Sequence, residues 1–500
     1  MWCTTTLDWA LRYAVALVRR CSLLAILFGL GCFSDPAGPT EATDGSTGVD
    51  ESSSTQPVAE STEGTSSGFA AGSSGTSFGT TVTTAADGST TAVGPSCGDG
   101  NTDAGEDCDD ANEIDGDGCN TDCRESGSVV WVETLPNVPG TGTDTLNAVA
   151  VLEGGAVLAG GSRFIGKPEA FQSEANLVRF SPDGTLELDV DVVTSERDDS
   201  VRGLDVDGLG RIYVVGERDT INGVQSSGWV AQVDADGEPV GDIVTSSVGE
   251  RSGFRAVATG PGLVTVVGFQ GDGAGVSTHA ASYSPMLTFA GNDDSVGSNP
   301  VETQSYLRDV VMDEHGIYVA GYRMDGGRLR GFTTTSPATG IAHVAEDPMH
   351  NTYIWGVALA EPGNVDSRLW SVGWTDGADF PLLAQLHRVS RAGELEETLP
   401  SYVGAVSEGA FYSSIVIGPA GDIIVAGGSL IGDGPNQFLP LVRRLDPEGD
   451  ERWTRVFNER DSVRGAISGL SLDADGSIAV CGHASDIAGA RRRMVAKLRP

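Results

Sequence analysis

Short runs in which apolar and polar residues alternate recur from residue 140 to the end of the chain. The most regular runs end in a glycine, as in YVVG at 213–216 and YVAG at 318–321. Alternation with a period of two is typical of half-buried β-strands. Successive glycines of this type lie 56, 52, 53, 52, 54 and 55 residues apart, at Gly160, Gly216, Gly268, Gly321, Gly373, Gly427 and Gly482. The pattern therefore predicts seven structural repeats.

Each repeat divides into four short strands. A first strand with alternating apolar residues, such as Val310 and Met312, leads through a tight turn to the strand that ends at the glycine. A longer, variable loop precedes the third strand, and a turn such as SPDG at 181–184 leads to the fourth. The residues just before this last turn keep the same period: Phe180, Val233, Tyr283, Thr335, Val389, Leu445 and Leu498. Four antiparallel strands repeated seven times predict an all-β fold, a seven-bladed β-propeller.

The two ends of the repeat region indicate how the ring closes. The seventh repeat stops at Pro500 after its third strand, while an additional strand, VVWVETL at 129–135, precedes the first repeat. Trp131 in this strand stands where Trp453 stands in the fourth strand of the sixth repeat. We expect 129–135 to complete the seventh blade, because an incomplete blade leaves an unpaired edge. An open solenoid of seven repeats is the alternative.

The repeats resemble those of bacterial extracellular β-propellers, which carry the phrase Asp-x-x-Gly-Asn-x-Tyr-Val-x-Gly-Tyr. The best matches are MDEHGIYVAGY at 312–322 and GWTDGADFP at 373–381. The resemblance implies a propeller domain over 129–500 and an extracellular setting. It implies no particular activity, because one fold carries many activities.

The composition agrees with a turn-rich β-protein. The 500 residues include 69 Gly and 22 Pro, and charged residues make up 20%. Asp and Glu outnumber Lys and Arg by 70 to 31, which gives a formal net charge of −39. We expect no nucleic-acid partner, because so acidic a protein repels a polyanion.

Residues 1–31 have the pattern of a signal peptide. Two arginines at 19–20 precede an apolar run at 21–31, which is too short to span a bilayer as a helix. The order of basic pair, apolar run, Gly-Leu-Gly and Cys32 resembles the lipobox of bacterial lipoproteins, although Gly29 stands where leucine is usual. The resemblance implies a lipid on the Cys32 thiol and a membrane partner, at the outer membrane or cell surface. Cleavage with secretion, without a lipid, is the alternative.

Residues 32–96 have the composition of a disordered linker. From 33 to 96, 36 of 64 residues are Ser, Thr or Gly, and none is Lys or Arg. Such a segment buries too little apolar surface to offset the loss of chain entropy on folding. We expect a flexible tether between the membrane and the folded part.

Four of the eight cysteines lie within residues 97–124: Cys97, Cys108, Cys119 and Cys123. In an exported segment without a hydrophobic core, four cysteines indicate two disulfides, with three connectivities open. A zinc site is disfavoured, because the one close pair has three intervening residues and no histidine is near. The segment CGDGNTDAGEDCDDANEIDGDGCNTDCR resembles the cysteine-rich repeat of myxobacterial surface proteins, which implies extracellular exposure. Its acidic residues make calcium a minor alternative to no cofactor, although no register fits an EF-hand.

The loops that join second to third strands are long and varied, as at 161–175 and 428–439, whereas turns on the opposite face are tight. Binding residues commonly lie on loops carried by a rigid scaffold, so the long-loop face is the expected binding face. At its inner rim, Arg202, Arg255 and Arg308 occupy the same place in three successive repeats, spaced 53 and 53. Three guanidinium groups near a central opening are suited to a carboxylate, a phosphate or an anionic glycan.

The alternative is that these arginines pair with local acids. The equivalent positions of the other repeats hold Asn147, Trp355, Ser413 and Ser468, and the acids considered as partners are Asp198, Asp199, Asp205, Glu250 and Asp309.

No catalytic residue and no metal ligand is predicted. The six histidines show no metal-binding spacing, Cys481 lies at a strand end as a small apolar residue, and no nucleophile elbow or phosphate loop occurs. We therefore expect an envelope-anchored or secreted propeller that binds a protein or glycan partner without catalysis. The alternatives are an enzyme of the lyase, glycosidase or quinone-dependent dehydrogenase type, with its site over the central channel, and a structural envelope protein without a specific ligand.

Overall fold

The computed structural model describes most of the chain after residue 96. Cys32 and the segments 1–31 and 32–96 lie outside the described residues, so the predicted lipid anchor and linker remain predictions. The described ranges are 97–136, 144–165, 172–193, 198–219, 225–246, 251–271, 275–292, 304–336, 343–345, 350–376, 382–399, 409–430, 438–457, 464–485 and 490–500. Within them no helix is long and apolar enough to cross a membrane.

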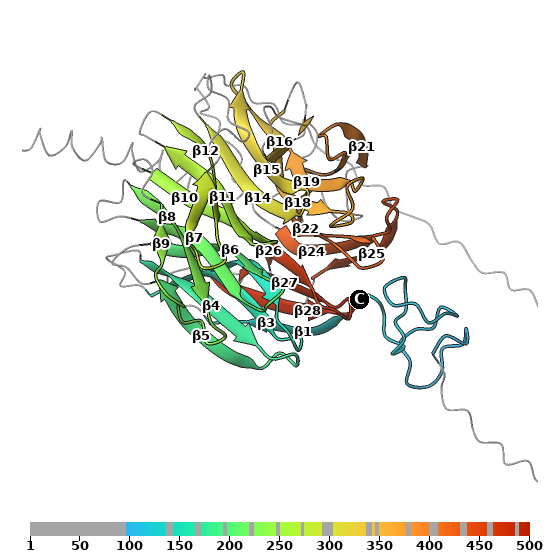
Figure 1. The fold of residues 1–500 in the computed structure, drawn as a ribbon. Helices are drawn as coiled ribbons and strands as arrows, with labels where there is room; N and C mark the ends of the chain where they lie inside the picture. Colours follow the sequence, from blue (N-terminus) through green and yellow to red (C-terminus); the bar gives the residue numbers. More distant parts are fainter. Residues whose placement is uncertain are drawn as a thin grey trace, which may run out of the picture. The chain divides into compact units, whose positions relative to one another are not determined.

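In these ranges, 28 strands form seven antiparallel sheets of four strands each, arranged around a common axis (Figure 1). Blade one has β2 (Thr145–Val151), β3 (Val157–Phe164), β4 (Ser173–Phe180) and β5 (Leu186–Val193); blade two has β6 (Asp199–Val206), β7 (Ile212–Asp219), β8 (Ser226–Val233) and β9 (Val244–Thr245); blade three has β10 (Arg251–Gly260), β11 (Leu263–Gly271), β12 (Val276–Tyr283) and β13 (Phe289–Asn292). Blade four has β14 (Ser305–Asp313), β15 (Gly316–Asp325), β16 (Arg328–Ser336) and β17 (His343–Val344); blade five has β18 (Thr352–Leu359), β19 (Leu369–Thr375), β20 (Leu383–Val389) and β21 (Leu395–Leu399). Blade six has β22 (Gly409–Ile417), β23 (Ile423–Leu430), β24 (Phe438–Leu445) and β25 (Glu451–Val456); blade seven has β26 (Arg464–Leu472), β27 (Ile478–Ser485), β28 (Arg491–Leu498) and β1 (Val129–Thr134). The predicted seven-bladed propeller is confirmed.

The turns between third and fourth strands explain one recurring glycine. Gly184, Gly237 and Gly449 have φ values of 88°, 77° and 98°, a conformation that side chains with a Cβ rarely adopt. Space is also short there, because a Cβ on Gly184 would lie 2.7 Å from the Trp131 ring and one on Gly237 would lie 2.7 Å from Val190. These glycines let the turn of one blade approach the outer strand of the blade before it.

The ring closes as the sequence predicts. Strand β1 pairs with β28 from Val129 opposite Leu498 to Thr134 opposite Met494, with one shift of register between Val129 and Trp131. Each first strand contacts the first strand of the next blade, and β26 of blade seven contacts β2 of blade one (Figure 1). This continuous circle of contacts excludes the open solenoid.

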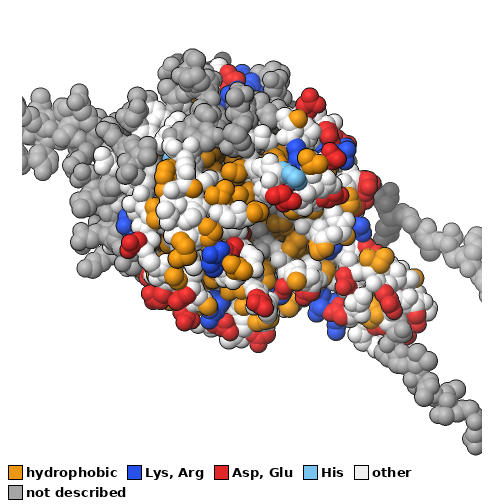
Figure 2. Space-filling model, viewed as in Figure 1, with side chains coloured by type: hydrophobic (Ala, Val, Ile, Leu, Met, Phe, Trp, Pro, Cys, Tyr) orange, Lys and Arg blue, Asp and Glu red, His pale blue; other side chains and the backbone are white. Residues whose placement is uncertain are grey.

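The hydrophobic core lies between neighbouring blades. Between blades two and three, Tyr213 and Val230 pack with Phe254 and Val257, all buried. Such stacking buries both faces of each sheet and makes the hydrophobic effect the main source of stability. Figure 2 shows acidic side chains along the rim of the molecule and a hollow near the middle of the face in view.

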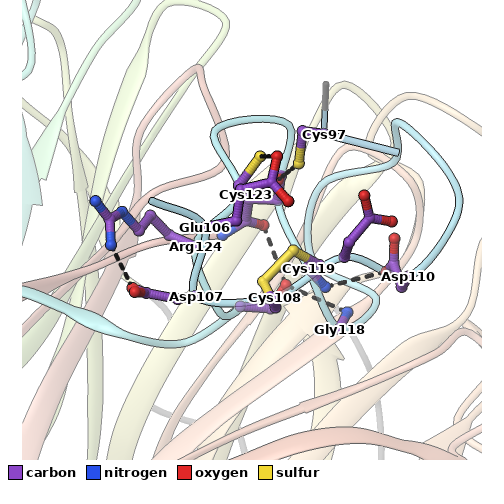
Figure 3. The surroundings of a disulfide bond; sticks show 12 residues. Cys97, Glu106, Asp107, Cys108, Asp110, Gly118, Cys119, Cys123 and Arg124 are labelled. Carbon is purple, nitrogen blue, oxygen red and sulfur yellow. Dashed lines mark hydrogen bonds and ion pairs between the residues drawn. A yellow bond between two sulfur atoms is a disulfide. The ribbon is translucent and has the colours of Figure 1, made fainter. Parts of the chain in front are cut away.

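The cysteine-rich module is a series of turns joined by one disulfide, Cys108–Cys119 (Figure 3). The thiols of Cys97 and Cys123 lie beside each other in hydrogen-bonding contact and are not bonded. Because Cys108 and Cys119 are bonded to each other, Cys97–Cys123 is the pairing left for the second predicted disulfide, and this bond remains a prediction.

The acidic residues of this module bind its own backbone. The Asp109 carboxylate accepts hydrogen bonds from the N–H groups of Ala111, Gly98 and Gly100, at 2.8 to 3.0 Å, and the bond from Ala111 most strongly lowers the pKa of this carboxyl. Within the described residues no cluster of three or more potential metal ligands occurs. The Asp109 carboxylate therefore stabilises the turns of the module by accepting hydrogen bonds from their backbone N–H groups.

Candidate ligand site in the central channel

The innermost strand of each blade contains a β-bulge at the same position. In blade two the pairing of β6 with β7 shifts between Val201 and Gly203, so Arg202 is the extra residue of the bulge. The same shift occurs in all seven blades, and the bulged residues are Asn147, Arg202, Arg255, Arg308, Trp355, Ser413 and Ser468. A bulge re-aims the side chain of its extra residue. The seven positions that the sequence analysis placed as equivalent are therefore the bulged residues of the seven first strands.

All seven bulged residues line one cavity of about 340 Å³ on the axis of the propeller. The first strands β6, β14, β18, β22 and β26, which carry five of them, lie nearest the centre in Figure 1. The cavity is the central channel, and the structure brings the three predicted arginines together in it.

Two of these arginines share one carboxylate. Glu217, the first residue after the glycine of blade two, lies 3.3 Å from Arg202 and 2.8 Å from Arg255 through its two oxygens. The acids that we considered as partners from the sequence have other contacts or are not described. Glu250 lies outside the described residues, and the acids with other contacts are Asp198, Asp199, Asp205 and Asp309. Arg202 and Arg255 thus form ion pairs with a nearby acid, as the alternative expected, but the acid is Glu217.

Arg308 is held in another way. Its guanidinium carbon lies 4.2 Å from the Trp355 ring centroid and 5.1 Å from that of Tyr322, and its Nη2 donates a hydrogen bond of 2.5 Å to the Tyr322 hydroxyl. Within the described residues Arg308 forms no ion pair. Aromatic contacts fix the plane of this guanidinium while leaving its charge uncompensated.

The cluster carries a net positive charge. Three guanidinium groups and the single carboxylate of Glu217 sum to +2, in a protein with a formal net charge of −39. Burial, opposed by the carboxylate of Glu217 and aided by the charges of Arg202 and Arg308, lowers the pKa of Arg255 to about 10. Arg255 therefore remains protonated at neutral pH.

A continuous arc of aromatic rings lies beside the arginines. Successive ring centroids are 5.0 to 5.5 Å apart through Phe269, Tyr306, Tyr322, Tyr353, Trp374, Phe411 and Phe438. We call these seven residues the aromatic arc. It crosses blades three to six, and Trp355 stacks on its Trp374 at 5.0 Å. The arc contacts Arg255 through Phe269 and Arg308 through Tyr306 and Tyr322.

The sequence analysis missed both Glu217 and the aromatic arc, although a signal for them exists. The residue directly after the repeating glycine is Gly161, Glu217, Phe269, Tyr322, Trp374, Gly428 or His483 in the seven repeats. Three aromatic residues in three successive blades mark this position as one that faces a shared environment.

The opposite side of the channel is small and polar. The Asn147 amide donates to the Val201 carbonyl at 2.7 Å, and the Ser413 hydroxyl donates to the Ile467 carbonyl at 2.6 Å. Ser468 forms no side-chain hydrogen bond within the described residues. This wall therefore offers the Asn147 carbonyl oxygen and two serine oxygens as acceptors.

Two carboxylates also line the channel, and both connect neighbouring blades. Asp205 accepts hydrogen bonds from the N–H and hydroxyl of Thr259 in the next blade, at 2.6 and 2.8 Å. Asp309 accepts from the N–H of Val357, also in the next blade, at 2.9 Å. Burial raises the pKa of Asp309 to about 6.

No histidine is among the described residues that line the cavity. His279 stacks on Phe254 at 5.6 Å, and His387 contacts Thr398 and Gln385 through its two nitrogens. Burial lowers the pKa of His483 to about 3. Cys481 is fully buried in the core, as expected for a small apolar residue.

The loops chosen from the sequence as the binding face are described only in part. Residues 161–164 and 428–430 belong to β3 and β23, and 173–175 and 438–439 belong to β4 and β24. The centres of these loops, 166–171 and 431–437, lie outside the described residues.

No protein-family model matches the sequence, and no curated protein matches it. Among solved structures, a fungal alcohol oxidase in complex with copper is similar at 14% identity over 75% of this chain and 77% of that chain, with a TM-score of 0.43. Sqt1 from Chaetomium thermophilum is similar at 16% identity over 71% of this chain and 95% of that chain, with a TM-score of 0.41. The propeller domain of the Trilobed protease from Pyrococcus furiosus has 9% identity over 70% of this chain and 92% of that chain, with a TM-score of 0.42. Likenesses this distant carry no argument about function.

Proposed function

We propose that this protein is an exported, lipid-anchored binding protein whose propeller recognises an acidic group of a protein or glycan partner in the central channel. The observation that carries the proposal is the Arg308 guanidinium, which lines the channel, is fixed by aromatic rings and has no ion pair within the described residues. Arg308 is half-buried, and a cation held in position by its neighbours is a preorganised site for an anion.

The charge distribution supports a specific site rather than general attraction. The chain as a whole repels anions at long range, because its formal net charge is −39. In the channel, Arg202, Arg255 and Arg308 face the three carboxylates of Glu217, Asp205 and Asp309, so the negative charge of the chain is offset there. An acidic ligand is therefore repelled less inside the channel than at the surface, and Arg308 offers it a guanidinium group that forms no ion pair within the described residues.

The contacts of the channel carboxylates favour binding over catalysis. A general acid or base needs a carboxyl within reach of the substrate and free to exchange a proton. Asp205 and Asp309 hold the backbone of the next blade, and Glu217 pairs with two arginines. Each of these groups has a structural task that proton transfer would disturb.

The anion site is tested by titrating the full chain with sodium acetate at constant ionic strength while tryptophan fluorescence is recorded. Trp355 lies against Arg308, so occupation of the site should give a saturable change. In the Arg308→Met variant we expect this change to disappear. The matched control is Arg368→Met, which removes an exposed arginine that pairs with Glu396, and it should behave as the unmodified protein. A non-saturable response, or equal responses in both variants, would reject the site.

The lipid anchor is tested separately by growth with radiolabelled palmitate. We expect label on the unmodified protein and none on the Cys32→Ala variant. Label that persists in the variant would reject Cys32 as the lipidated residue, and absence of label from both proteins would reject anchoring altogether.

A further inference from the structure

We infer that the ligand of the channel is a carboxylated sugar, with its carboxylate on Arg308 and its hydroxyl groups on the wall formed by Asn147, Ser413 and Ser468. This inference rests on the proposed anion site and adds the chemistry of the rest of the ligand. Its basis is that one cavity of about 340 Å³ presents hydrogen-bond donors on one side and acceptors on the other.

The three guanidinium groups can only donate, and the Asp205 and Asp309 carboxylates on the same side accept hydrogen bonds from the next blade. A guanidinium has five N–H groups and no acceptor, and it matches the two oxygens of a carboxylate. The Arg308 Nη2 donates one hydrogen bond to the Tyr322 hydroxyl, and the guanidinium carbon lies 4.2 Å from the Trp355 ring centroid. The remaining N–H groups lie in the plane of the guanidinium and can donate to a ligand. A carboxylate that lies in this plane would be held in one orientation.

Glu217 favours a ligand with a single negative charge. It lies 2.8 Å from Arg255 and compensates part of the charge of the cluster. A dianionic phosphate would bring a second negative charge close to this carboxylate, whereas a carboxylate brings one. The cluster is thus better matched to a carboxylic acid than to a phosphate ester.

The opposite wall requires a ligand that donates hydrogen bonds. One amide hydrogen of Asn147 and the hydroxyl hydrogen of Ser413 are directed to the backbone carbonyls of Val201 and Ile467. Their oxygens therefore act as acceptors toward the cavity. A simple alkyl carboxylic acid would leave these acceptors unpaired, at a cost that a hydroxylated ligand avoids.

The size and the remaining lining fit one sugar ring. A cavity of about 340 Å³ is at the lower end of ligand pockets in proteins. Leu204, Val311 and Val416 are half-buried, also line it and offer apolar contact to the C–H groups of a pyranose. A uronic acid combines a carboxylate, hydroxyl donors and such a ring in one unit.

The test is calorimetric titration of the full chain with glucuronate, glucose and acetate at constant ionic strength. We expect glucuronate to bind at least roughly tenfold more tightly than either other compound, because only it uses both walls. Arg308→Met should weaken glucuronate binding by at least about tenfold. Ser468→Ala should weaken it roughly two- to tenfold and leave acetate binding unchanged, since it removes one acceptor.

Ser227→Ala is the matched control, because Ser227 lies on β8 outside the cavity lining and should leave all affinities unchanged. Ser468 makes no side-chain hydrogen bond within the described residues, so its loss should not disturb the fold, and equal melting temperatures would confirm this. Equal affinity for acetate and glucuronate, or no effect of Ser468→Ala, would overturn the carboxylated sugar and leave the anion site standing. Equal affinity for glucose and glucuronate, or no binding of any compound, would overturn both.

Discussion

At the scale of single residues, Glu217 determines how much positive charge the channel presents. Its carboxylate forms ion pairs with both Arg202 and Arg255. Without it, the charges of these two guanidinium groups in the cavity would lose this compensation. The same contacts that lower the charge also stabilise the fold, because like charges in close proximity repel. Stability and affinity are therefore opposed at this position.

Replacing Glu217 by glutamine should shift the two properties in opposite directions. We expect acetate and glucuronate to bind roughly tenfold more tightly, since an intramolecular competitor is removed. We expect the free energy of unfolding to fall by about 1–3 kcal/mol, because buried arginines lose a charged partner. Calorimetric titration and urea unfolding measure the two effects. The control is Glu187→Gln, which removes an exposed carboxylate on β5 that pairs with Arg179, and it should change neither affinity nor stability. A weaker affinity in Glu217→Gln would contradict the role given to Glu217.

Asp309 should make stability depend on pH. Its pKa is about 6 in the folded protein, because it is buried, and about 3.9 in an unfolded chain. Between these values the folded state holds a proton that the unfolded state releases, so Asp309 lowers the free energy of unfolding as pH rises from about 4 to about 6.

The Asp309→Asn variant should therefore gain stability relative to the unmodified protein as pH rises, by on the order of 2 kcal/mol between pH 4 and pH 7. Urea unfolding at the two pH values measures the difference. Asp183→Asn serves as a control of opposite sign, because the hydrogen bond from Ser181 lowers the pKa of Asp183. A parallel response of the two variants would show that Asp309 is not buried as described.

At the scale of elements, the strands could be predicted from the sequence, but the β-bulge in each first strand could not. Period-two alternation located the strands, and a spacing of 53 residues placed Arg202, Arg255 and Arg308 at equivalent positions. Alternation cannot reveal an extra unpaired residue, because a bulge depends on the pairing of two strands. Glu217 escaped prediction for a related reason, since strand pairing within blade two brings it near Arg202 and contact between blades brings it near Arg255.

Strand β1 is the element on which closure depends. The N–H of Leu135 donates to the Arg493 carbonyl at 2.8 Å, so by alternation the N–H of Glu133 also faces β28 and that of Thr134 faces away. Both side chains are exposed, which makes the two residues a matched pair.

Proline at these two positions should have very different effects. Glu133→Pro removes a hydrogen bond of the β1–β28 ladder and should lower the melting temperature by several degrees, corresponding to about 3 kcal/mol. Thr134→Pro loses no ladder hydrogen bond and should have a much smaller effect. Thermal unfolding followed by circular dichroism compares them. Equal melting temperatures would contradict closure by β1.

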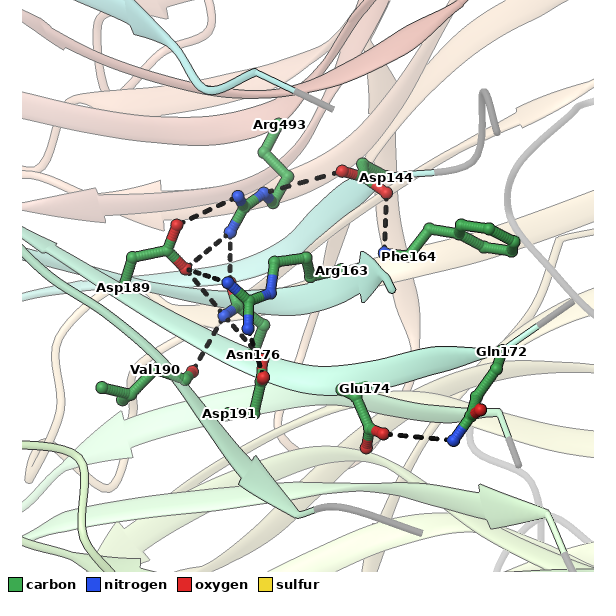
Figure 4. A network of polar contacts seen from close by, with 10 residues as sticks. All are labelled: Asp144, Arg163, Phe164, Gln172, Glu174, Asn176, Asp189, Val190, Asp191 and Arg493. Atoms are coloured by element: carbon green, nitrogen blue, oxygen red, sulfur yellow. Dashed lines mark hydrogen bonds and ion pairs between the residues drawn. The ribbon is translucent and has the colours of Figure 1, made fainter. Parts of the chain in front are cut away.

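At the scale of the whole molecule, a buried charge network joins the ends of the propeller. Arg493 on β28 is 2% exposed and binds Asp189 on β5 at 3.0 and 3.1 Å, and it also contacts Asn176 on β4 and Asp144 before β2 (Figure 4). Blade seven and blade one therefore meet through ionic contacts as well as through packing. Breaking a buried ion pair is costly because the remaining charge is left without a partner.

Arg493→Met should therefore destabilise the propeller by about 3–5 kcal/mol. The comparison is Arg388→Met on β20, whose ion pairs with Glu396 and Glu397 are partly exposed, and whose loss should cost at most about 1 kcal/mol. Urea unfolding of both variants gives the two values. A loss of similar size in both would argue that the network contributes little to closure.

The most direct test of the whole account is a crystal structure of the full chain soaked with glucuronate. The account predicts the sugar carboxylate within hydrogen-bonding distance of the Arg308 guanidinium, with a sugar hydroxyl donating to the Asn147 carbonyl oxygen. A sugar bound outside the channel, or bound there with its carboxylate turned away from Arg308, would contradict it.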